Sequence, residues 1–269
     1  MRDDWDRRAR ENARYYVATG RMDWTDEEFL ASGVAELADT VLNDMGNVCQ
    51  GRAPASMRVL EIGCGAGRVT RPLAGVFGEV HAVDVSGEMI ARARTVLAGL
   101  ANVHLYCNNG MDLSVIPDLP FDFAFSVIVF QHIPSLAVIE SYFREVARLL
   151  RPGTLFKVQV HGRPELPDEE PPPMPVPPPE VLPPSEVPWR WRLAGMIPLW
   201  IRRRIVRPIR RLIAPPPERT KRQYDPPDTW VGVMLEPADA QALCERCGFE
   251  LRYQVGAGSQ EYWLWCFKK

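Results

Sequence analysis

Three glycines at alternate positions follow a short apolar run, and this feature constrains the chain most. The segment Val59-Leu-Glu-Ile-Gly-Cys-Gly-Ala-Gly67 places Gly63, Gly65 and Gly67 after a predicted strand and before a predicted helix. Glycine is needed where backbone turns tightly and approaches a ligand closely. Backbone N–H groups at the start of the helix suit a carboxylate or a phosphate. The segment therefore predicts a ligand-binding strand–loop–helix unit, although a tight turn without a ligand would also explain the glycines.

Two carboxylates accompany this loop. Glu61 stands in the strand before it, and Asp84 ends the next predicted strand. The G-x-G-x-G spacing differs from the G-x-G-x-x-G pattern of dinucleotide-binding loops. Glu61 would repel a pyrophosphate but suits a ligand that carries an ammonium group and a sulfonium, and Asp84 can accept hydrogen bonds from both ribose hydroxyls of an adenosine. The alternative for Asp84 is a helix cap, although Ser86 is the better cap.

The rest of the chain has three parts by pattern. Residues 57–160 alternate between strand-like and helix-like segments, and five such βα units predict a parallel sheet with helices on both faces. The run Phe121–Phe130 is almost continuously apolar, as in a strand buried on both faces. We therefore expect an α/β fold with an N-terminal helical cap or lid at 1–50, a core domain at 51–162 and 229–269, and an insert rich in Pro and Arg at 163–228.

Four segments resemble successive motifs of one enzyme family. VLEIGCGAGRVT, HAVDVSGEMI, FDFAFSVIVFQHIP and LLRPG are similar to the motifs of class I S-adenosylmethionine (SAM)-dependent methyltransferases, in particular the type 11 small-molecule subgroup. The resemblance implies a Rossmann-like sheet of seven strands, mostly parallel, with an antiparallel last strand. The closing segments FELRYQV and QEYWLWCF fit that ending as a hairpin. It also implies SAM as cofactor, S-adenosylhomocysteine (SAH) as product, and a small or amphiphilic methyl acceptor.

The resemblance also implies roles for single residues. Asn109 stands where the family often has an acid, and its amide oxygen can still accept a hydrogen bond from the adenine amino group. The implied cofactor contacts are Glu61, Gly63, Gly65 and Gly67 at the methionine end with Cys64 as a small filler, Asp84 at the ribose, Val85 and Met89 on the adenine, Asn109, Gly110, Met111 and Asp112 beside the adenine, Ser126 to Gln131 near the methyl group, and Tyr16, with Tyr15 and Trp24, in the lid.

His132 is the candidate general base. It stands in Phe130-Gln-His-Ile-Pro134, just past the fourth predicted strand, at the carboxyl edge where open α/β sheets bind ligands. A base is needed only if the nucleophile is protonated, since the sulfonium already activates the methyl group. The alternative is that His132 orders the loop by hydrogen bonds to backbone. His161 is a weaker second candidate, and His81 and His104 are expected to be packing or edge residues.

The six cysteines predict reduced thiols and no metal site. The pair Cys244-x-x-Cys247 lacks the second cysteine or histidine pair that a zinc site needs, so both are expected to be core-facing thiols. The N-terminus lacks the apolar core of a signal peptide, and no apolar run reaches the ~18 residues of a membrane span. These patterns predict a cytoplasmic protein.

The insert is strongly basic although the net charge of the chain is −2. From Arg190 to Arg222 it holds eleven Lys or Arg residues and one acid. Within 189–213, isoleucines and arginines separate onto opposite sides of a helical wheel, which favours a lid docked on the acceptor site or peripheral contact with an anionic inner membrane surface. Nucleic acid is disfavoured as a partner. Two alternative functions stay open: a non-catalytic SAM- or nucleoside-binding module anchored by the insert, and an RNA or protein methyltransferase.

Overall fold

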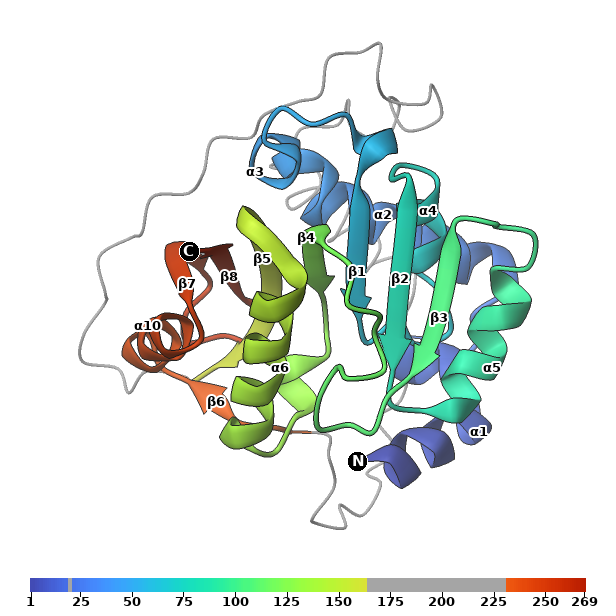
Figure 1. Ribbon diagram of the computed structural model, residues 1–269. Coiled ribbons are helices and arrows are strands. Elements are labelled where there is room, and N and C mark those ends of the chain that lie inside the picture. The colour runs from blue at the N-terminus through green and yellow to red at the C-terminus, as the bar shows by residue number, and fades with distance from the viewer. Residues whose placement is uncertain (19–20, 164–230) are drawn as a thin grey trace, which may run out of the picture.

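The computed structural model describes residues 1–18, 21–163 and 231–269, and its centre is one mixed sheet (Figure 1). The strand order is β3-β2-β1-β4-β5-β8-β7, and a short strand, β6, pairs with β5 off this path. The strands are β1 (Arg58–Ile62), β2 (Glu79–Asp84), β3 (Val103–Cys107), β4 (Phe121–Ser126), β5 (Leu150–Gly162), β6 (Met234–Leu235), β7 (Phe249–Val255) and β8 (Tyr262–Lys268).

Helices cover both faces of the sheet. One face packs on α6 and α10, and the other packs on α2, α3 and α4, with a separate apolar cluster on each side. The first helix, α1, packs against α2 and α5. The helices are α1 (Arg2–Val17), α2 (Asp26–Thr40), α3 (Met45–Cys49), α4 (Thr70–Ala74), α5 (Gly87–Val96), α6 (Leu136–Leu149) and α10 (Pro237–Arg246), with the short 3-10 turns η1 (Leu42–Asp44), η2 (Pro54–Ser56) and η3 (Phe130–His132).

The predicted α/β architecture is confirmed. β1 pairs in parallel with β2 and β4, and every residue of β4 is buried, as its apolar run predicts. The closing hairpin is also confirmed, because β8 runs antiparallel to both β5 and β7. The sheet has eight strands and not seven, since the two-residue β6 adds a parallel pairing at the end of β5.

Two elements have local irregularities. β5 begins at Leu150, directly after α6, so the strand includes Arg151, Pro152 and Gly153. α1 carries a kink at Asn12, where φ is −166° and ψ is 85°. The side chain of Asn12 accepts a hydrogen bond from the backbone N–H of Tyr15, which supplies a local partner where the helix is interrupted.

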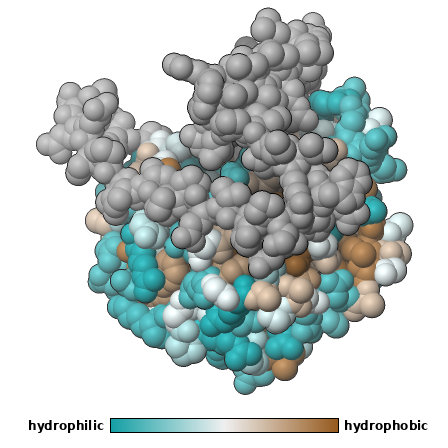
Figure 2. Space-filling model, turned by 90° about the horizontal axis from the view of Figure 1, so that it is seen from above, coloured by the Kyte–Doolittle hydropathy of each residue, from teal (hydrophilic) through white to brown (hydrophobic). Residues whose placement is uncertain are grey.

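The insert 163–228 lies outside the described residues except for Arg163, and so does all of the basic segment 189–213. In residues 1–18, 21–163 and 231–269, no helix combines the length and the apolar character that a membrane span requires. Figure 2 shows hydrophilic residues mixed with smaller hydrophobic patches on the coloured part of one face. The predicted core-facing positions of Cys244 and Cys247 are confirmed, since both are buried.

Candidate functional site

A cavity lies at the carboxyl ends of β1, β2 and β4, and α1 covers it. Its empty volume is about 840 Å³, including space open to solvent. The carboxyl edge is where open α/β sheets bind their ligands. Among the described residues the lining comprises Met1, Trp5, Tyr16, Val17, Glu61, Ile62, Gly63, Cys64, Gly65, Arg68, Val69, Val83, Asp84, Val85, Met89, Asn108, Val127, Ile128, Val129, His132, Ile133 and Tyr142.

The glycine loop forms the floor of this cavity. Gly63 and Gly65 have φ values of +77° and +52°, which side chains rarely adopt. A Cβ on Gly63 would lie 2.1 Å from Val129 Cγ2, so the loop needs glycine there for space as well as for conformation. Gly67 lies outside the lining, and a Cβ on it would meet Leu97 at 3.0 Å. Gly67 therefore packs against the end of α5, and its role at the methionine end stays a prediction.

Glu61 is a fully buried carboxylate beside the loop. Its Oε2 atom has no hydrogen-bond partner among the described residues. Burial raises the pKa of Glu61 to about 7, against the opposing effect of the nearby Arg68 guanidinium. A buried polar atom without a partner is costly, so it fits a ligand group that donates hydrogen bonds and carries positive charge. The predicted placement of Glu61 at the binding site is the one that the cavity supports most directly.

Asp84 is tied to the loop by its own side chain. One carboxylate oxygen accepts from the Gly65 N–H at 2.8 Å, and the other accepts from the Ser86 N–H at 2.9 Å. Burial raises the pKa of Asp84, while these backbone hydrogen bonds act in the opposite direction. Ser86 is the cap of α5, because its hydroxyl accepts from the Met89 N–H. Asp84 thus has lone pairs left for a ligand in the cavity.

The roof of the cavity comes from α1. Trp5 and Tyr16 line it, and the Arg8 guanidinium, itself buried, lies 4.7 Å from the centre of the Trp5 ring. Arg2 anchors the start of the helix by donating to the carbonyl oxygens of Val85 and Asn108. The helical cap therefore reaches the site as a lid.

Tyr16 was expected in this lid, and Trp5 was not among the expected site residues. Tyr15 and Trp24 lie outside the lining, and Trp24 packs on Phe29. In the sequence Trp5 recurs at helical spacing with Tyr16, but that spacing does not show which element the shared face covers.

The end of β4 supplies the candidate catalytic residue. His132 lies in η3, buried and lining the cavity, with its Nε2 3.3 Å from the Gln131 amide nitrogen. Ile128 has a positive φ of 58°, an uncommon conformation for a β-branched residue, and its N–H donates to the Gln159 side chain. Such backbone strain is concentrated at functional sites.

Three residues of the segment predicted near the methyl group, Ser126, Phe130 and Gln131, lie outside the cavity lining. The Ser126 hydroxyl donates to the Ile62 carbonyl oxygen, so it links β4 to β1. Gln131 contacts Gln159 and His132 instead. His161 is buried on β5 and does not line the cavity, and burial lowers its pKa.

The segment after β3 differs from expectation. Asn109, Gly110, Met111 and Asp112 were expected to border the adenine, but none of them lines the cavity. The Asn109 side chain accepts from the N–H groups of Met111 and Asp112, so the four residues form their own polar turn. Asn108, one residue earlier, lines the cavity, and its amide donates to the Tyr142 hydroxyl at 2.6 Å.

Comparisons with known proteins agree with this geometry. Residues 59–153 match the model of a family described as "Methyltransferase domain". A malonyl-[acyl-carrier protein] O-methyltransferase from Bacillus anthracis is 35% identical over 98 residues, which is 35% of each chain. A ubiquinone biosynthesis O-methyltransferase from Xanthomonas oryzae is 32% identical over 102 residues, 37% of this chain and 41% of that protein. The chain thus matches well under half the length of these relatives.

Solved structures share the fold. Magnesium protoporphyrin IX methyltransferase from Synechocystis PCC 6803, crystallised with SAH, superposes with a TM-score of 0.56 at 16% identity, over 100% of this chain and 98% of that one. DesVI from Streptomyces venezuelae gives a TM-score of 0.56 at 14% identity, over 97% and 98% of the two chains. The fold is that of class I methyltransferases, as the sequence motifs predict.

Proposed function

We propose that this chain, whose residues 59–153 are a class I SAM-dependent methyltransferase domain, transfers a methyl group from SAM to a small or amphiphilic molecule. The observation that carries the proposal is the cavity at the carboxyl edge of the sheet. There Glu61, a buried carboxylate whose Oε2 has no hydrogen-bond partner among the described residues, stands beside a glycine loop and a second acid, Asp84. These groups suit the ammonium and the ribose of SAM respectively.

The residues present fit SAM at each end. Glu61 Oε2 would accept from the ammonium group, since it has no other hydrogen-bond partner among the described residues. Asp84 would hold the ribose hydroxyls, while Val85 and Met89 offer apolar surface to the adenine. Bound there, SAM supplies a methyl group already activated by the sulfonium.

The protein's own task is positioning. Trp5 and the rest of the α1 roof exclude water from the cavity, and the loop after β4 holds the acceptor near the methyl group. His132 would take a proton from a protonated acceptor, since its ring lines the same cavity. Its contact with Gln131 would orient the ring.

The acceptor is proposed to be a small or carrier-bound molecule with an apolar part. Two of the sequence relatives are named as O-methyltransferases. One name refers to malonyl-[acyl-carrier protein] and the other to ubiquinone biosynthesis. The cavity walls after β4 are apolar, with Val127, Ile128 and Val129. The prediction that 189–213 docks on the acceptor site or contacts a membrane concerns residues outside those described, and it stays a prediction.

The test combines binding with product analysis. Calorimetry should show that SAM and SAH bind, and Asp84→Ala should weaken both by about 1–3 kcal/mol through lost charged hydrogen bonds. Asp118→Ala is the matched control, because that carboxylate is exposed and distant from the cavity. Labelled SAM incubated with cell extract should transfer its methyl group to the small-molecule or lipid fraction.

Each other result has a meaning. Label only in RNA or protein would support the macromolecular alternative. Binding without label in any fraction would support the non-catalytic module. Absence of SAM and SAH binding would overturn the proposal.

A further inference from the structure

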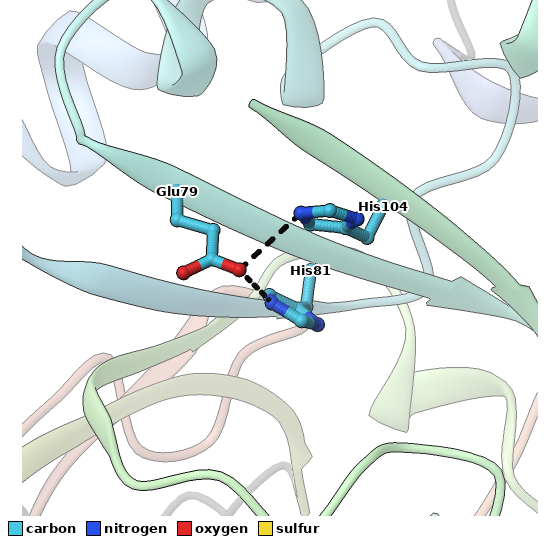
Figure 3. A group of neighbouring side chains, drawn as sticks. All are labelled: Glu79, His81 and His104. Carbon is cyan, nitrogen blue, oxygen red and sulfur yellow. Dashed lines mark hydrogen bonds and ion pairs between the residues drawn. The ribbon is translucent and has the colours of Figure 1, made fainter. Parts of the chain in front are cut away.

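We propose that Glu79, His81 and His104 form a binding site for a divalent transition-metal ion of the Zn²⁺ class, separate from the cofactor cavity. The three side chains converge on one face of the paired strands β2 and β3 (Figure 3). One ligand atom from each lies within 4.8 Å of the others. Two imidazoles and one carboxylate are a common ligand set for such ions. This proposal does not depend on the proposed methyl transfer.

Strand register brings the ligands together. Glu79 and His81 are two residues apart on β2, so their side chains share a face, and His104 on β3 is the direct partner of His81. The ring centroids of the two histidines lie 4.6 Å apart. From the sequence, both histidines were expected to be packing or edge residues and no metal site was expected, because residue spacing does not show that β2 pairs with β3.

The distances suit a metal centre. Glu79 Oε1 lies 2.8 Å from His81 Nε2 and 3.2 Å from His104 Nε2. Ligands bound at about 2.0–2.1 Å in a tetrahedral site lie about 3.3 Å apart, so Glu79 Oε1 needs to move only slightly away from each imidazole nitrogen to admit an ion. His104 is 44% exposed, which gives the ion a path from solvent and leaves room for a water ligand.

The surrounding groups fix the ligands in place. The Tyr106 hydroxyl lies 3.0 Å from His81 Nδ1, the nitrogen that would not bind the ion. A hydroxyl both donates and accepts, so Tyr106 can accept from Nδ1–H and leave the Nε2 lone pair for the metal. The Arg58 guanidinium donates to the other carboxylate oxygen of Glu79 at 2.7 Å. Hydrogen-bonded outer groups of this kind orient ligands in metal sites.

The site would join two neighbouring strands. β3 is the edge strand of the sheet, and His104 would tie it to β2 through the ion. An ion that binds the folded chain and not the unfolded chain stabilises the fold. Zn²⁺ is therefore expected to raise the unfolding temperature.

The experiment measures metal binding to the full chain purified without tag or chelator. Titration with Zn²⁺ against a chromophoric chelator should show one bound ion per chain. Co²⁺ should give the visible absorption of a four-coordinate site without the near-ultraviolet band of thiolate ligands. His104→Gln, at an exposed position, should weaken Zn²⁺ binding by about 100-fold and abolish the rise in unfolding temperature.

The matched control is Cys107→Ser, which alters an exposed potential ligand on the same strand. This variant should bind Zn²⁺ as the wild type does. Glu79→Gln should lose affinity like His104→Gln, and circular dichroism checks that each variant folds, since His81 itself is too buried for a safe substitution. Equal Zn²⁺ affinity in wild type and His104→Gln, or a loss in Cys107→Ser, would overturn the proposal.

Discussion

The rings of Trp5 and His132 meet edge to face, with centroids 5.2 Å apart and planes inclined by 69°. One residue belongs to the first helix and the other to the turn after β4, so the contact joins the roof of the cavity to the candidate base. Any movement of α1 that admits SAM must break or shift this contact. The contact therefore couples α1 physically to the η3 turn.

Trp5→Ala is expected to weaken SAM binding by about tenfold, because it removes the largest aromatic surface of the roof. Calorimetry with SAM and SAH measures the effect. Trp24→Ala is the matched control, since that ring packs on Phe29 and its Nε1 donates to the Ala18 carbonyl oxygen away from the cavity. Equal losses in the two variants would show that α1 acts only through fold stability.

His132→Ala is expected to lower kcat by about 100-fold or more with SAM affinity nearly unchanged, as loss of a general base would do. Single-turnover assays with saturating SAM measure the rate, and calorimetry measures the SAM affinity. A variant that loses stability and SAM binding together would instead support the alternative in which His132 only orders the loop.

Glu61 should make stability depend on pH in the ligand-free protein. Burial raises its pKa from 4.5 to about 7, so between these values the native chain holds a proton that the unfolded chain releases. The contribution of this group is fully present below about pH 4.5 and falls by about 3 kcal/mol as pH rises to about 7 and beyond. Glu61→Gln, which imitates the protonated form, should be relatively more stable at pH 8 and should lack this slope in urea unfolding.

The same carboxyl should link SAM binding to proton release. A cation bound beside Glu61 favours its ionised form, so SAM should bind more tightly as pH rises from about 5 to about 8. Calorimetry in buffers of different ionisation enthalpy measures the released proton near pH 6. Glu61→Gln is the control, and proton release that persists in it would assign the effect to another group.

The glycine loop of this site could be predicted because its residues are contiguous in the sequence. A strand buried on both faces reads as a continuous apolar run, and Gly63 and Gly65 are required by the turn that follows it. Trp5 was not identified, because a helical stripe shows which side of a helix is buried but not which element covers it. The turn at Asn109–Asp112 was expected beside the adenine, and it lies outside the cavity lining. The Asn109 side chain accepts hydrogen bonds from the backbone N–H groups of Met111 and Asp112, and the residue types alone do not show this.

Gly63→Ala should be far more costly than Gly99→Ala. Both glycines have positive φ, so in both variants this backbone conformation lowers the free energy of unfolding by about 1 kcal/mol. A Cβ on Gly99 meets nothing within 4 Å, whereas a Cβ on Gly63 meets Val129, which adds about 1–3 kcal/mol of overpacking. Urea unfolding compares the two, and equal losses would contradict the close packing of the loop against the end of β4.

The buried ion pair behind the sheet should be sensitive to loss of one partner. Lys157 on β5 donates to Asp44 Oδ2 at 2.6 Å, and the Trp265 Nε1 donates to the same oxygen. Lys157→Met leaves the Asp44 charge buried with only neutral donors, so the free energy of unfolding should fall by about 3–5 kcal/mol. The double variant Asp44→Asn with Lys157→Met removes both charges and should recover part of that loss. Strictly additive effects of the two single changes would show that the pair contributes no coupling, and denaturant unfolding of the four proteins decides the question.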